Sequence, residues 1–461
     1  MRIDARNGGE GSRSEDDRMS AAHTRRTERA LAQAEGIRAR LADTPSHVRA
    51  GWLRDAAGMI EADAERHARI IVEQGVKTIC EARSEVARAI GTLRLSAEEA
   101  TRSTGRTIDF GADPRGVGRW GFQDHRPVGT VLAITPFNDP LNLVAHKVGP
   151  ALAAGCPIIV KPDPRTPAPA SMLCDTLLVA GTPKGAVDCI EAHVPETTAM
   201  IRDPRIAMVS FTGGRSAGSA IAQAAAGKPF ALEMGGVAVT ILLDDADITM
   251  AVPRIVSGMI AAAGQNCLHV QRVIAQGGVK NELMRRLARA LDEIRLGDPD
   301  DEASEMGPLI EQDALDRCIE WTAEAVAGGA KILAGGTPEH HSDTRPRFRP
   351  TLLGNPSREA KIVRQEVFGP IATLETARDL PEALEMAALS GPALAAAIFT
   401  QSLEAPRALR KLNVGQIVVN DTTDFRIDAM PFGGPGAAGL GREGVRSALQ
   451  AMSEPVVMCI A

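Results

Sequence analysis

Tyrosine is absent from the 461-residue chain, aromatic residues make up only 3% of it, and no run of about 18 apolar residues occurs. Without such a run no membrane-spanning helix is predicted, so we expect no membrane association. Neither sign of charge dominates, because 52 Lys and Arg stand against 58 Asp and Glu, a formal net charge of −6. This mildly acidic balance offers no electrostatic reason to bind nucleic acid.

Cysteine patterns of the usual structural kinds are also missing. The seven cysteines are odd in number and form no C-x-x-C pair, so neither a disulfide framework nor a zinc site is predicted, and we expect no metal. Segment 1–20 mixes Arg with Glu and Asp around no apolar core. It is predicted to be a flexible tail and not a secretory signal or transit peptide, and the expected compartment is the cytoplasm.

The chain does have the length and the apolar content, 44%, for two or three domains with a sizeable core. From Ala22 to about Glu99, apolar residues recur at intervals of three and four among Arg and Glu, which predicts helices. From Pro127, short β-branched runs alternate with Ala-rich helical runs, and a second alternating series extends from Met250 to about Thr400. Alternation of this kind predicts parallel strands, hence an α/β fold with two doubly wound domains in series.

The first alternating series consists of the segments 131–134, 141–154, 157–160, 170–179, 206–211, 216–226, 231–233 and 239–242. Two segments do not fit the alternation. Segment 107–126 contains Gly, Pro and polar residues and is predicted to be a protruding hairpin, and the β-rich segment 454–460 is predicted to be a terminal strand.

Cys267 is the first residue with candidate chemistry. It ends the sequence Gly264-Gln265-Asn266-Cys267, directly after the apolar helical run 255–263. A thiolate is a strong nucleophile where nearby dipoles lower its pKa. The alternative is a buried cysteine that serves only in packing.

Two polar candidates follow predicted strands. Glu233 stands in Leu232-Glu233-Met234-Gly235-Gly236, at the carboxyl edge of the sheet, where a ligand can bind and a Glu can act as a general base. Asn138 follows Thr135-Pro136-Phe137 after the strand 131–134, and its amide can donate to a developing oxyanion. The alternatives are a solvated turn Glu and an Asn that only closes a turn.

Several further motifs are candidates for binding a cofactor. Lys161 ends another strand and can reach a ribose or a phosphate. The glycines of Phe211-Thr212-Gly213-Gly214-Arg215-Ser216-Ala217-Gly218 would let the backbone approach a pyrophosphate at a helix N-terminus. The segments Gln365-Glu366-Val367-Phe368-Gly369-Pro370 and Pro431-Phe432-Gly433-Gly434 are candidate loops for cofactor or substrate, although each is also typical of a plain turn.

Taken together, these motifs resemble those of the NAD(P)-dependent aldehyde dehydrogenase superfamily, from about Ala22 to the end of the chain. The resemblance rests on P-F-N, V-K-P, F-T-G-x-x-x-x-G, L-E-x-G-G, G-Q-x-C, E-V-F-G-P and P-F-G-G in family order. The flanking residues Pro140-Leu141-Asn142 and His146-Lys147 are most similar to the branch that contains lactaldehyde, phosphonoacetaldehyde and non-phosphorylating glyceraldehyde-3-phosphate dehydrogenases.

The resemblance implies a role for each catalytic candidate. Cys267 would attack the aldehyde carbon, Asn138 with the Cys267 backbone N–H would hold the oxyanion, and Glu233 would activate the water that hydrolyses the thioester. The implied cofactor is NADP or NAD. The residues implied to bind it are Thr135, Pro136, Phe137, Lys161, Pro164, Arg165, Gly213, Gly214, Gly218, Met234, Gly235, Glu366 and Phe368.

The resemblance also implies a division of the chain. Segments 21–106 and 128–235 would form a Rossmann-like cofactor-binding domain, 236–436 a catalytic domain, and 107–127 with 446–461 a small β element for oligomerisation. A homodimer or homotetramer is therefore expected, because an added strand satisfies an otherwise exposed sheet edge.

Three positions depart from the family pattern. Arg215 stands where Ser or Thr is usual, and Val237 where a Lys is common. Pro164 stands where NAD-preferring members often have a Glu for the ribose hydroxyls. Because that Glu would repel a 2′-phosphate, and Lys161 and Arg165 lie nearby, we predict that NADP is used; its preference over NAD stays open.

The substrate is less determined. Asn266 stands where branch members that act on phosphorylated or phosphonate aldehydes often have Arg, and Asp139 would repel an anion. Arg88, Arg94 and Arg102 are candidates to bind an anion, or else form a solvated helix face. We predict oxidation of a small polar aldehyde to its carboxylate, with an anionic phosphonate or phosphorylated aldehyde as the alternative.

Two other classes of function compete with this prediction. A CoA-acylating aldehyde dehydrogenase would release an acyl-CoA, but such relatives often lack the carboxylate that Glu233 provides. A non-catalytic binding protein would not need Cys267, Glu233 and Asn138 together.

Overall fold

The computed structural model describes residues 15–461 except 103 and 342–344, and it begins with helix α1 (Glu15–Ala42). The tail predicted at 1–20 lies partly outside the described residues. Residues 15–20 are helical instead of a tail, because the helix that the pattern predicts from Ala22 extends further toward the N-terminus.

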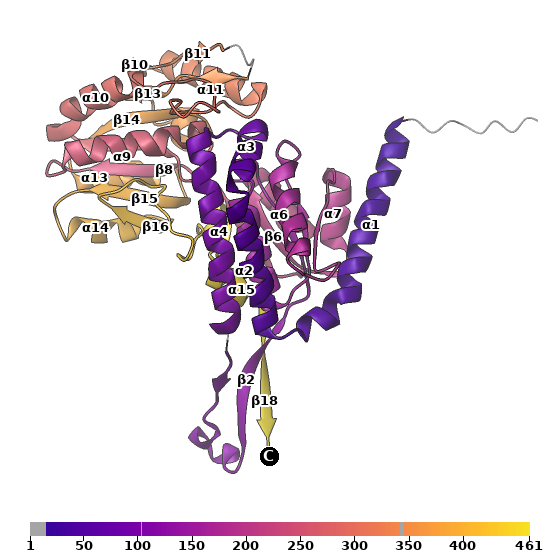
Figure 1. Ribbon diagram of the computed structural model, residues 1–461. Helices are drawn as coiled ribbons and strands as arrows, with labels where there is room; N and C mark the ends of the chain where they lie inside the picture. Colours follow the sequence, from indigo (N-terminus) through magenta and orange to yellow (C-terminus); the bar gives the residue numbers. More distant parts are fainter. Residues whose placement is uncertain (1–14, 103, 342–344) are drawn as a thin grey trace, which may run out of the picture.

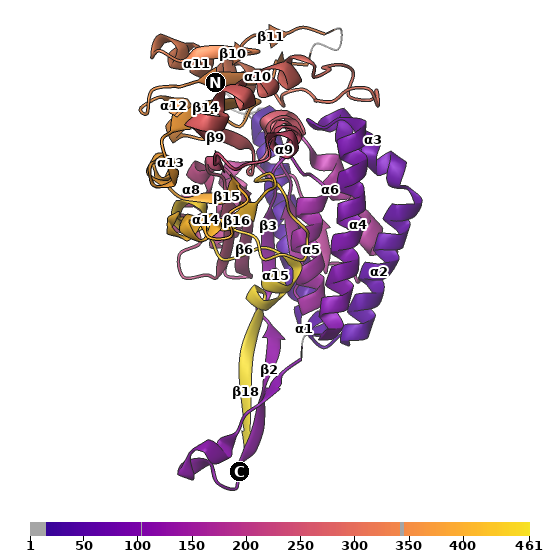
Figure 2. The same ribbon diagram turned by 90° about the vertical axis from the view of Figure 1, so that its left-hand side faces the viewer.

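The predicted N-terminal helices are confirmed by α1, α2 (Ser46–Ala62), α3 (Ala64–Gln74) and α4 (Ile79–Arg102). Apolar residues at intervals of three and four along α4, such as Val86, Ile90, Leu93 and Ala97, are buried. Figures 1 and 2 show α2 and α4 side by side along one flank of the first sheet. One long face of α4 is therefore available to support residues of the site.

The first sheet has the strand order β17-β7-β6-β3-β4-β5, and all its pairs are parallel except β17 with β7. The strands are β3 (Thr130–Ile134), β4 (Ile158–Lys161), β5 (Val187–Cys189), β6 (Ile206–Gly213), β7 (Phe230–Met234) and β17 (Gly439–Leu440). The helices α5 (Asn142–Ala154), α6 (Pro167–Val179), α7 (Val194–Arg202) and α8 (Arg215–Ala224) connect them. Because neighbouring strands run parallel, the segments after β3, β4, β6 and β7 emerge at one edge.

The second sheet has the order β10-β13-β14-β9-β8-β15-β16, again parallel except at one end, where β10 pairs antiparallel with β13. Its strands are β8 (Ala238–Leu242), β9 (Val270–Gln276), β10 (Lys331–Ala334), β13 (Thr351–Gly354), β14 (Ile371–Ala377), β15 (Ala393–Phe399) and β16 (Val414–Val419). Its helices include α9 (Ile248–Ile260), α10 (Gly277–Asp292), α11 (Gln312–Ala327), α12 (Lys361–Arg364), α13 (Leu380–Ala388) and α14 (Ala405–Ala408). The predicted α/β class with two doubly wound sheets is confirmed.

An ion pair lies inside the second sheet. Arg272 on β9 is fully buried and donates from Nε and Nη2 to the two carboxylate oxygens of Glu375 on β14, at 2.8 Å each. Removing either residue would leave the charge of the other buried without a partner, which destabilises a folded protein.

A narrow arm projects away from the two sheets (Figures 1 and 2). It consists of β1 (Arg106–Thr107), β2 (Trp120–Pro127) and β18 (Ser453–Ile460), paired antiparallel in the order β1-β2-β18. Helix α15 (Val445–Ala451) leads into β18. The predicted hairpin and terminal strand are confirmed, and they form one sheet together. Among the helices that the structure describes, none is both long and apolar enough to cross a membrane.

Candidate active site

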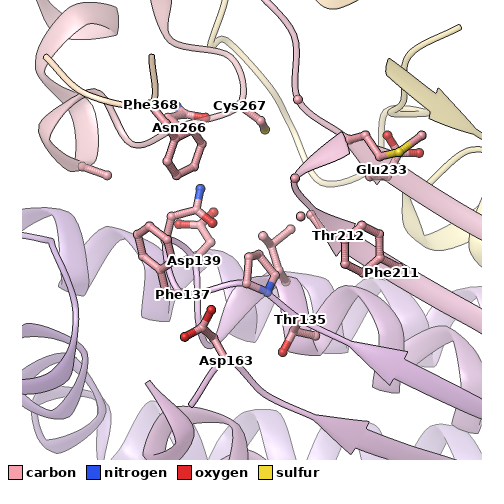
Figure 3. A pocket seen from close by; sticks show the side chains of 18 of the residues that line it. Thr135, Phe137, Asp139, Asp163, Phe211, Thr212, Glu233, Asn266, Cys267 and Phe368 are labelled. Atoms are coloured by element: carbon pink, nitrogen blue, oxygen red, sulfur yellow. The ribbon is translucent and has the colours of Figure 1, made fainter. Parts of the chain in front are cut away.

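A cavity of about 1240 Å³ lies where the edges of the two sheets meet, and it contains the three catalytic candidates Cys267, Glu233 and Asn138. Figure 3 shows Cys267 and Asn266 on one side of the space, Asp139 and Phe137 opposite them, and Glu233 to one side. The alternatives of a sealed packing cysteine and a solvated turn glutamate are therefore wrong, because Cys267 is half-buried at the cavity wall and Glu233 is buried there.

The loop before Cys267 has an unusual backbone. Ala262 and Ala263 have φ values of 51° and 53° in the short helix η3 (Ala261–Gly264), a left-handed conformation that is costly for residues with a Cβ. The Glu81 carboxylate of α4 accepts the Ala262 N–H at 2.8 Å, and the Gln265 amide donates to Ala262 O at 3.0 Å. These bonds hold the loop that presents Cys267.

The family motifs around this loop pack on one another. Gly264 has a φ of 69°, and a Cβ there would collide with the carbonyl of Gly369 and the nitrogen of Pro370. Only glycine permits this approach, so the segment before the thiol is packed directly against the segment that carries Glu366 and Phe368.

The protonation of the two reacting groups is set mainly by burial. Burial raises the pKa of the Cys267 thiol, as does the Glu366 carboxylate, whereas the Arg426 guanidinium opposes the shift. Burial, with the Glu443 carboxylate nearby, holds the pKa of Glu233 well above its ordinary range. Both oxygens of Glu233 are buried and have no hydrogen-bond partner in the described part of the chain, so they are free to bind a water.

Behind Glu233 lies a buried polar group formed by Lys147, Glu443 and two hydroxyls. The Lys147 ammonium donates to Glu443, to Thr212 Oγ1 at 2.9 Å and to Ser210 Oγ at 3.1 Å. Burial alone would raise the pKa of Glu443, but Lys147 lowers it to about 2. A carboxylate that stays charged thus faces Glu233, and an ammonium lies beside both.

Helix α4 positions the segment that carries Asn138. The Glu85 carboxylate accepts the backbone N–H groups of Leu141 and Asn142 at 2.8 and 3.0 Å, at the start of α5. Lys77 donates to Glu85 at 2.8 Å and also to Asp139, the residue after Asn138. Lys77 is 8% exposed. The Asn138 loop is thus held from both sides by one buried ammonium and its two carboxylates.

Asp139 is neutralised a second time by Arg88, whose Nη1 lies 3.3 Å from its Oδ2. Burial alone would raise the pKa of Asp139, but Lys77 and Arg88 together lower it. Arg88 also pairs with Asp428 at 2.9 Å, and His146 Nε2 lies 2.8 Å from the same carboxylate. The position of Asp139 in the sequence suggested a free negative charge in the cavity. The structure shows instead that this charge is paired with Lys77 and Arg88.

Arg426 and Asp424 line the same cavity and belong to none of the predicted motifs. The guanidinium of Arg426 lies 4.0 Å from the centre of the Phe432 ring, and its Nη2 is 3.4 Å from His146 Nε2. Within residues 24–461, leaving out 103 and 342–344, neither Arg426 nor Asp424 forms an ion pair, and the Nε of Arg426 is buried without a partner. Burial raises the pKa of Asp424, whose side chain is hydrogen-bonded to Thr422.

The predicted cofactor residues form the other part of the cavity, and their chemistry fits a dinucleotide. Helix α8 begins at Arg215, and its N-cap residue Gly214 provides no side-chain cap. A Cβ at Gly214 would meet no atom within 4 Å, so the N-terminus of the helix is open to an anion. Lys161 and Thr135 line the same space. Burial raises the pKa of Glu366 to about 8, and its Oε1 is buried without a partner in the described chain.

Two aromatic rings and one arginine shape this part of the cavity. Phe137 and Phe368 meet edge to face, with ring centres 5.8 Å apart. Arg215, which replaces the usual small hydroxyl residue, donates to the carbonyl of Gly235 at 2.7 Å and to that of Pro392 at 2.6 Å. Arg215 thus ties helix α8 to the second sheet beside Glu366 and is not positioned solely for phosphate contact.

Near Lys161 the charges are mixed. Arg165 is paired with Asp163 at 2.7 Å and with Glu311, and its guanidinium lies 4.4 Å from the centre of the Phe137 ring. Lys161 forms no ion pair with a described residue. Lys161 is therefore the more available cation for a phosphate.

Most predicted site residues line the cavity, and four do not. Pro164 is absent from the lining, where its neighbour Asp163 takes part instead, and Gly218 lies against Met234 as a packing contact between α8 and β7. Arg94 pairs with Glu61 and Arg102 with Glu98, on the outside of α4. The remainder are brought together: Thr135, Pro136, Phe137, Asp139, Lys161, Arg165, Gly213, Gly214, Met234, Gly235, Asn266, Glu366, Phe368 and Arg88.

Helix geometry explains why only one of the three arginines faces the site. Residue 94 lies about 240° around the helix from residue 88, because each residue turns by about 100°. Residue 102 lies on nearly the same side as residue 88 but about 21 Å further along the axis. The proposal that Arg94 and Arg102 bind an anion is therefore wrong, and Arg88 alone of these faces the cavity.

The chain is similar to known aldehyde dehydrogenases over most of its length. The aldehyde dehydrogenase family profile matches residues 12–457. The aldehyde-dehydrogenase-like protein y4uC of Sinorhizobium fredii is 40% identical over 417 residues, covering 90% of this chain and 80% of that protein. Aspartate-semialdehyde dehydrogenase 1 of Pseudomonas canavaninivorans is 38% identical and covers 90% and 88%. The crystal structure of aldehyde dehydrogenase 21 from Physcomitrella patens, in complex with the reaction product succinate, superposes with a TM-score of 0.91 at 31% identity, covering 95% and 90%.

Proposed function

The chain belongs to the aldehyde dehydrogenase family and is an NAD(P)-dependent enzyme of that family, and from this premise we propose that it oxidises a small polar aldehyde to its carboxylate. This reaction is supported by one observation: Cys267, Asn138 and Glu233 line the same cavity as the open N-terminus of α8. The cavity wall around Cys267 is rich in polar and charged side chains, which favours a polar substrate over a long apolar one.

In the proposed reaction the Cys267 thiol gives its proton to the Glu233 carboxylate, which later passes it to solvent. The sulfur forms a C–S bond to the aldehyde carbon, and the π electrons of the C=O bond move to its oxygen, which becomes an oxyanion. The Asn138 amide, held by the Lys77 and Glu85 contacts to its loop, donates to that oxyanion. Bound NAD(P) would supply the hydride acceptor, and loss of hydride from the carbon bonded to Cys267 would leave a thioester on that residue.

Glu233 completes the cycle. Its carboxylate takes a proton from a water, the water oxygen adds to the thioester carbon, and the C–S bond breaks to return the thiol and release the carboxylic acid. The raised pKa of Glu233 suits this role, because a carboxylate of raised pKa is the stronger base. Glu443 lies near Glu233 and accepts a hydrogen bond from the Lys147 ammonium. These two groups can accept and donate the proton that Glu233 takes from the water.

The test is a panel of aldehydes assayed with NAD and with NADP, with Cys267→Ser as the blank. We expect turnover with at least one small polar aldehyde, and none for Cys267→Ser. Glu233→Gln is expected to give a single burst of reduced cofactor and then stop at the thioester. Absence of turnover across the panel would overturn the proposed function, and a product that requires CoA would favour the acylating alternative.

We propose NADP as a usable cofactor, with Lys161 as the cation nearest the site of a 2′-phosphate. Lys161 forms no ion pair with a described residue, and position 164 holds Pro and not Glu. Arg165, in contrast, is already paired with Asp163 and Glu311. The ratio of kcat/KM for NADP to that for NAD measures this directly, and use of NAD alone would contradict it.

We also propose a homodimer or homotetramer formed through the arm. Strand β18 is an edge strand whose Val456, Val457 and Met458 are 40, 58 and 51% exposed, and β16 is a free edge of the second sheet. Open edges with apolar side chains are covered in stable proteins. Sedimentation of the full chain, compared with a variant in which Val457 and Met458 are replaced by Lys and Glu, tests this; an unchanged mass would overturn the proposal.

A further inference from the structure

The carboxylate of Glu366 lies directly against the backbone of two glycines at the end of the first sheet. A Cβ at Gly235 would collide with both of its oxygens, so only glycine leaves room for the group there. The Gly236 N–H donates a hydrogen bond to the same carboxylate. Glu366 lines the cavity, and its Oε1 is buried without a partner in the described chain. The cavity therefore contains an anchored carboxylate with one oxygen left to accept a hydrogen bond from a ligand.

Arg215, the first residue of α8, holds the backbone beside this carboxylate. Its Nε donates to the Gly235 carbonyl at 2.7 Å, and its Nη2 donates to the Pro392 carbonyl at 2.6 Å. Gly235 follows β7 of the first sheet, whereas Pro392 precedes β15 of the second. Hydrogen bonds from a charged donor are about twice as strong as neutral ones. One guanidinium thus joins the two sheets at the point where Glu366 lies.

The guanidinium of Arg215 is closely packed in this position. A Cβ at Gly236 would lie 2.9 Å from Nη2 of Arg215 and 2.8 Å from the Cα of Ala393, so a side chain there would displace one of them. Arg215 is half-buried, and among the described residues it is not part of the cavity lining. It therefore acts on a bound molecule through its neighbours and not by direct contact.

Arg215 also affects the charge of Glu366. Burial raises the pKa of Glu366 to about 8. Three groups oppose this shift, first the Arg215 guanidinium, then the Gly236 N–H and the Arg317 guanidinium of α11. Without Arg215 the pKa of Glu366 would be higher, and a larger fraction of this carboxyl group would be protonated at neutral pH.

We propose that Arg215 is a positioning residue for the dinucleotide, which holds Glu366 in place as the acceptor for hydroxyls of the ribose beside the reacting ring. Ribose hydroxyls are donors that a carboxylate can accept. Glu366 also lies close enough to Cys267 to act on the pKa of its thiol, which is where the reacting ring must lie. This inference rests on the proposed function, since it concerns the cofactor of the same reaction. It also gives a reason for Arg215 at a position where the family usually has Ser or Thr.

Equilibrium binding tests the proposal without turnover. One probe is the reduced cofactor, NADPH or NADH, whichever binds the wild type more tightly, and its fluorescence reports the Kd. The other probe is ADP, which has the adenosine and the pyrophosphate but not the second ribose, measured by calorimetry. We expect Arg215→Thr to raise the Kd of the reduced cofactor at neutral pH by about tenfold, the lower end for a hydrogen bond to a charged group. The Kd of ADP should not change.

The pH dependence separates an effect on Glu366 from a general loosening of the site. The other charged or titratable groups that face Glu366 are Arg317 and the Cys267 thiol, and burial raises the pKa of that thiol, which keeps it protonated. Because hydroxyls donate to the ionised carboxylate, binding should tighten as the pH rises through about 8. In Arg215→Thr this tightening should move to higher pH, and in Arg215→Lys, which keeps the charge, it should move less.

A double-mutant cycle asks whether Arg215 acts through Glu366. Glu366→Gln should weaken binding and remove this pH dependence, and Arg215→Thr in that background should weaken binding no further. Arg289→Thr, which breaks an exposed ion pair with Glu293 at the end of α10, is the matched control and should change neither Kd. If Arg215→Thr does not fold, Arg215→Lys with and without Glu366→Gln makes the same comparison.

The outcomes are distinguishable. A wild type that binds no reduced cofactor would overturn the proposed function itself. If the cofactor binds and Arg215→Thr weakens ADP as much as the cofactor, Arg215 serves the phosphates or the whole site, and only the positioning role is overturned. An equal loss with and without Glu366→Gln, or a pH profile that does not move, would also overturn that role.

Discussion

The ammonium of Lys77 is expected to control both the stability of the Asn138 loop and the rate of the reaction. Replacing Lys77 by Met removes the ammonium that donates to both Glu85 and Asp139, and it leaves the buried carboxylate of Glu85 and the half-buried one of Asp139. Removing one partner of a buried ion pair costs about 3–5 kcal/mol. Arg88 still lies 3.3 Å from Asp139, and Glu85 still accepts two backbone N–H groups, so the lower end, about 3 kcal/mol, is expected.

A double-mutant cycle tests whether this loss belongs to the pair. Asp139→Asn keeps the bond between Lys77 and Glu85 and is expected to cost about 2 kcal/mol, the value of one charge-assisted hydrogen bond. Because the same contact is lost only once, Lys77→Met with Asp139→Asn should cost about 2 kcal/mol less than the sum of the single changes. Urea unfolding measures each free energy. Arg94→Met, which breaks the exposed pair between Arg94 of α4 and Glu61 of α2, is the control and should cost less than about 1 kcal/mol.

The kinetic part asks whether Lys77 acts through Asn138. Asn138→Ala removes the oxyanion donor and is expected to lower kcat by about 100- to 1000-fold. Lys77→Met, which only displaces that donor, should lower kcat by about tenfold with little change in KM. In the Asn138→Ala background, Lys77→Met should lower kcat no further. A further tenfold loss there, or additive free energies in the cycle, would refute this account of Lys77.

Three further outcomes are expected. In the proposed reaction Glu233 acts as a carboxylate, so kcat should rise with pH as this group loses its proton. The Glu443 carboxylate helps to raise the pKa of Glu233, so Glu443→Gln should move the rise in kcat to lower pH. A pH profile that does not move, or that moves to higher pH, would contradict this role of Glu443. Lys161→Met should lower kcat/KM for NADP more than for NAD, and Glu311→Gln should raise the ratio of NADP to NAD, both measured by initial rates. Arg272→Met should lower the free energy of unfolding by about 3–5 kcal/mol, because it leaves a buried carboxylate unpaired; a loss below about 1 kcal/mol in urea would count against it.

The fold and the meeting of Cys267, Asn138 and Glu233 in one cavity could be predicted from the sequence because their signals are local. Alternating runs indicated the parallel strands, and the segment after β3 and the end of β7 had to meet at one sheet edge, which brings Asn138 and Glu233 together. Cys267 was marked by its motif, although only the structure shows the left-handed backbone at Ala262 and Ala263 that presents it.

The charged network could not be predicted, because its members are distant in the chain. Lys77 and Asp139 are 62 positions apart, and nothing in the local pattern of either residue indicates the other. Arg426 stands in no motif that the sequence analysis used. The loop that carries it begins with a turn, in which the Phe425 N–H donates to the Thr422 carbonyl, so no helical or strand periodicity marks Arg426 in the sequence.

The same network changes what the charge at position 139 means for a substrate. As an isolated carboxylate, Asp139 would repel an anionic aldehyde, which was the expectation from its position. Two cations within hydrogen-bonding or ion-pair distance cancel most of its field, since Coulomb energy falls with distance and is largest for contacting charges. The expectation that Asp139 would repel an anionic aldehyde therefore does not hold, because its carboxylate is already paired with Lys77 and Arg88.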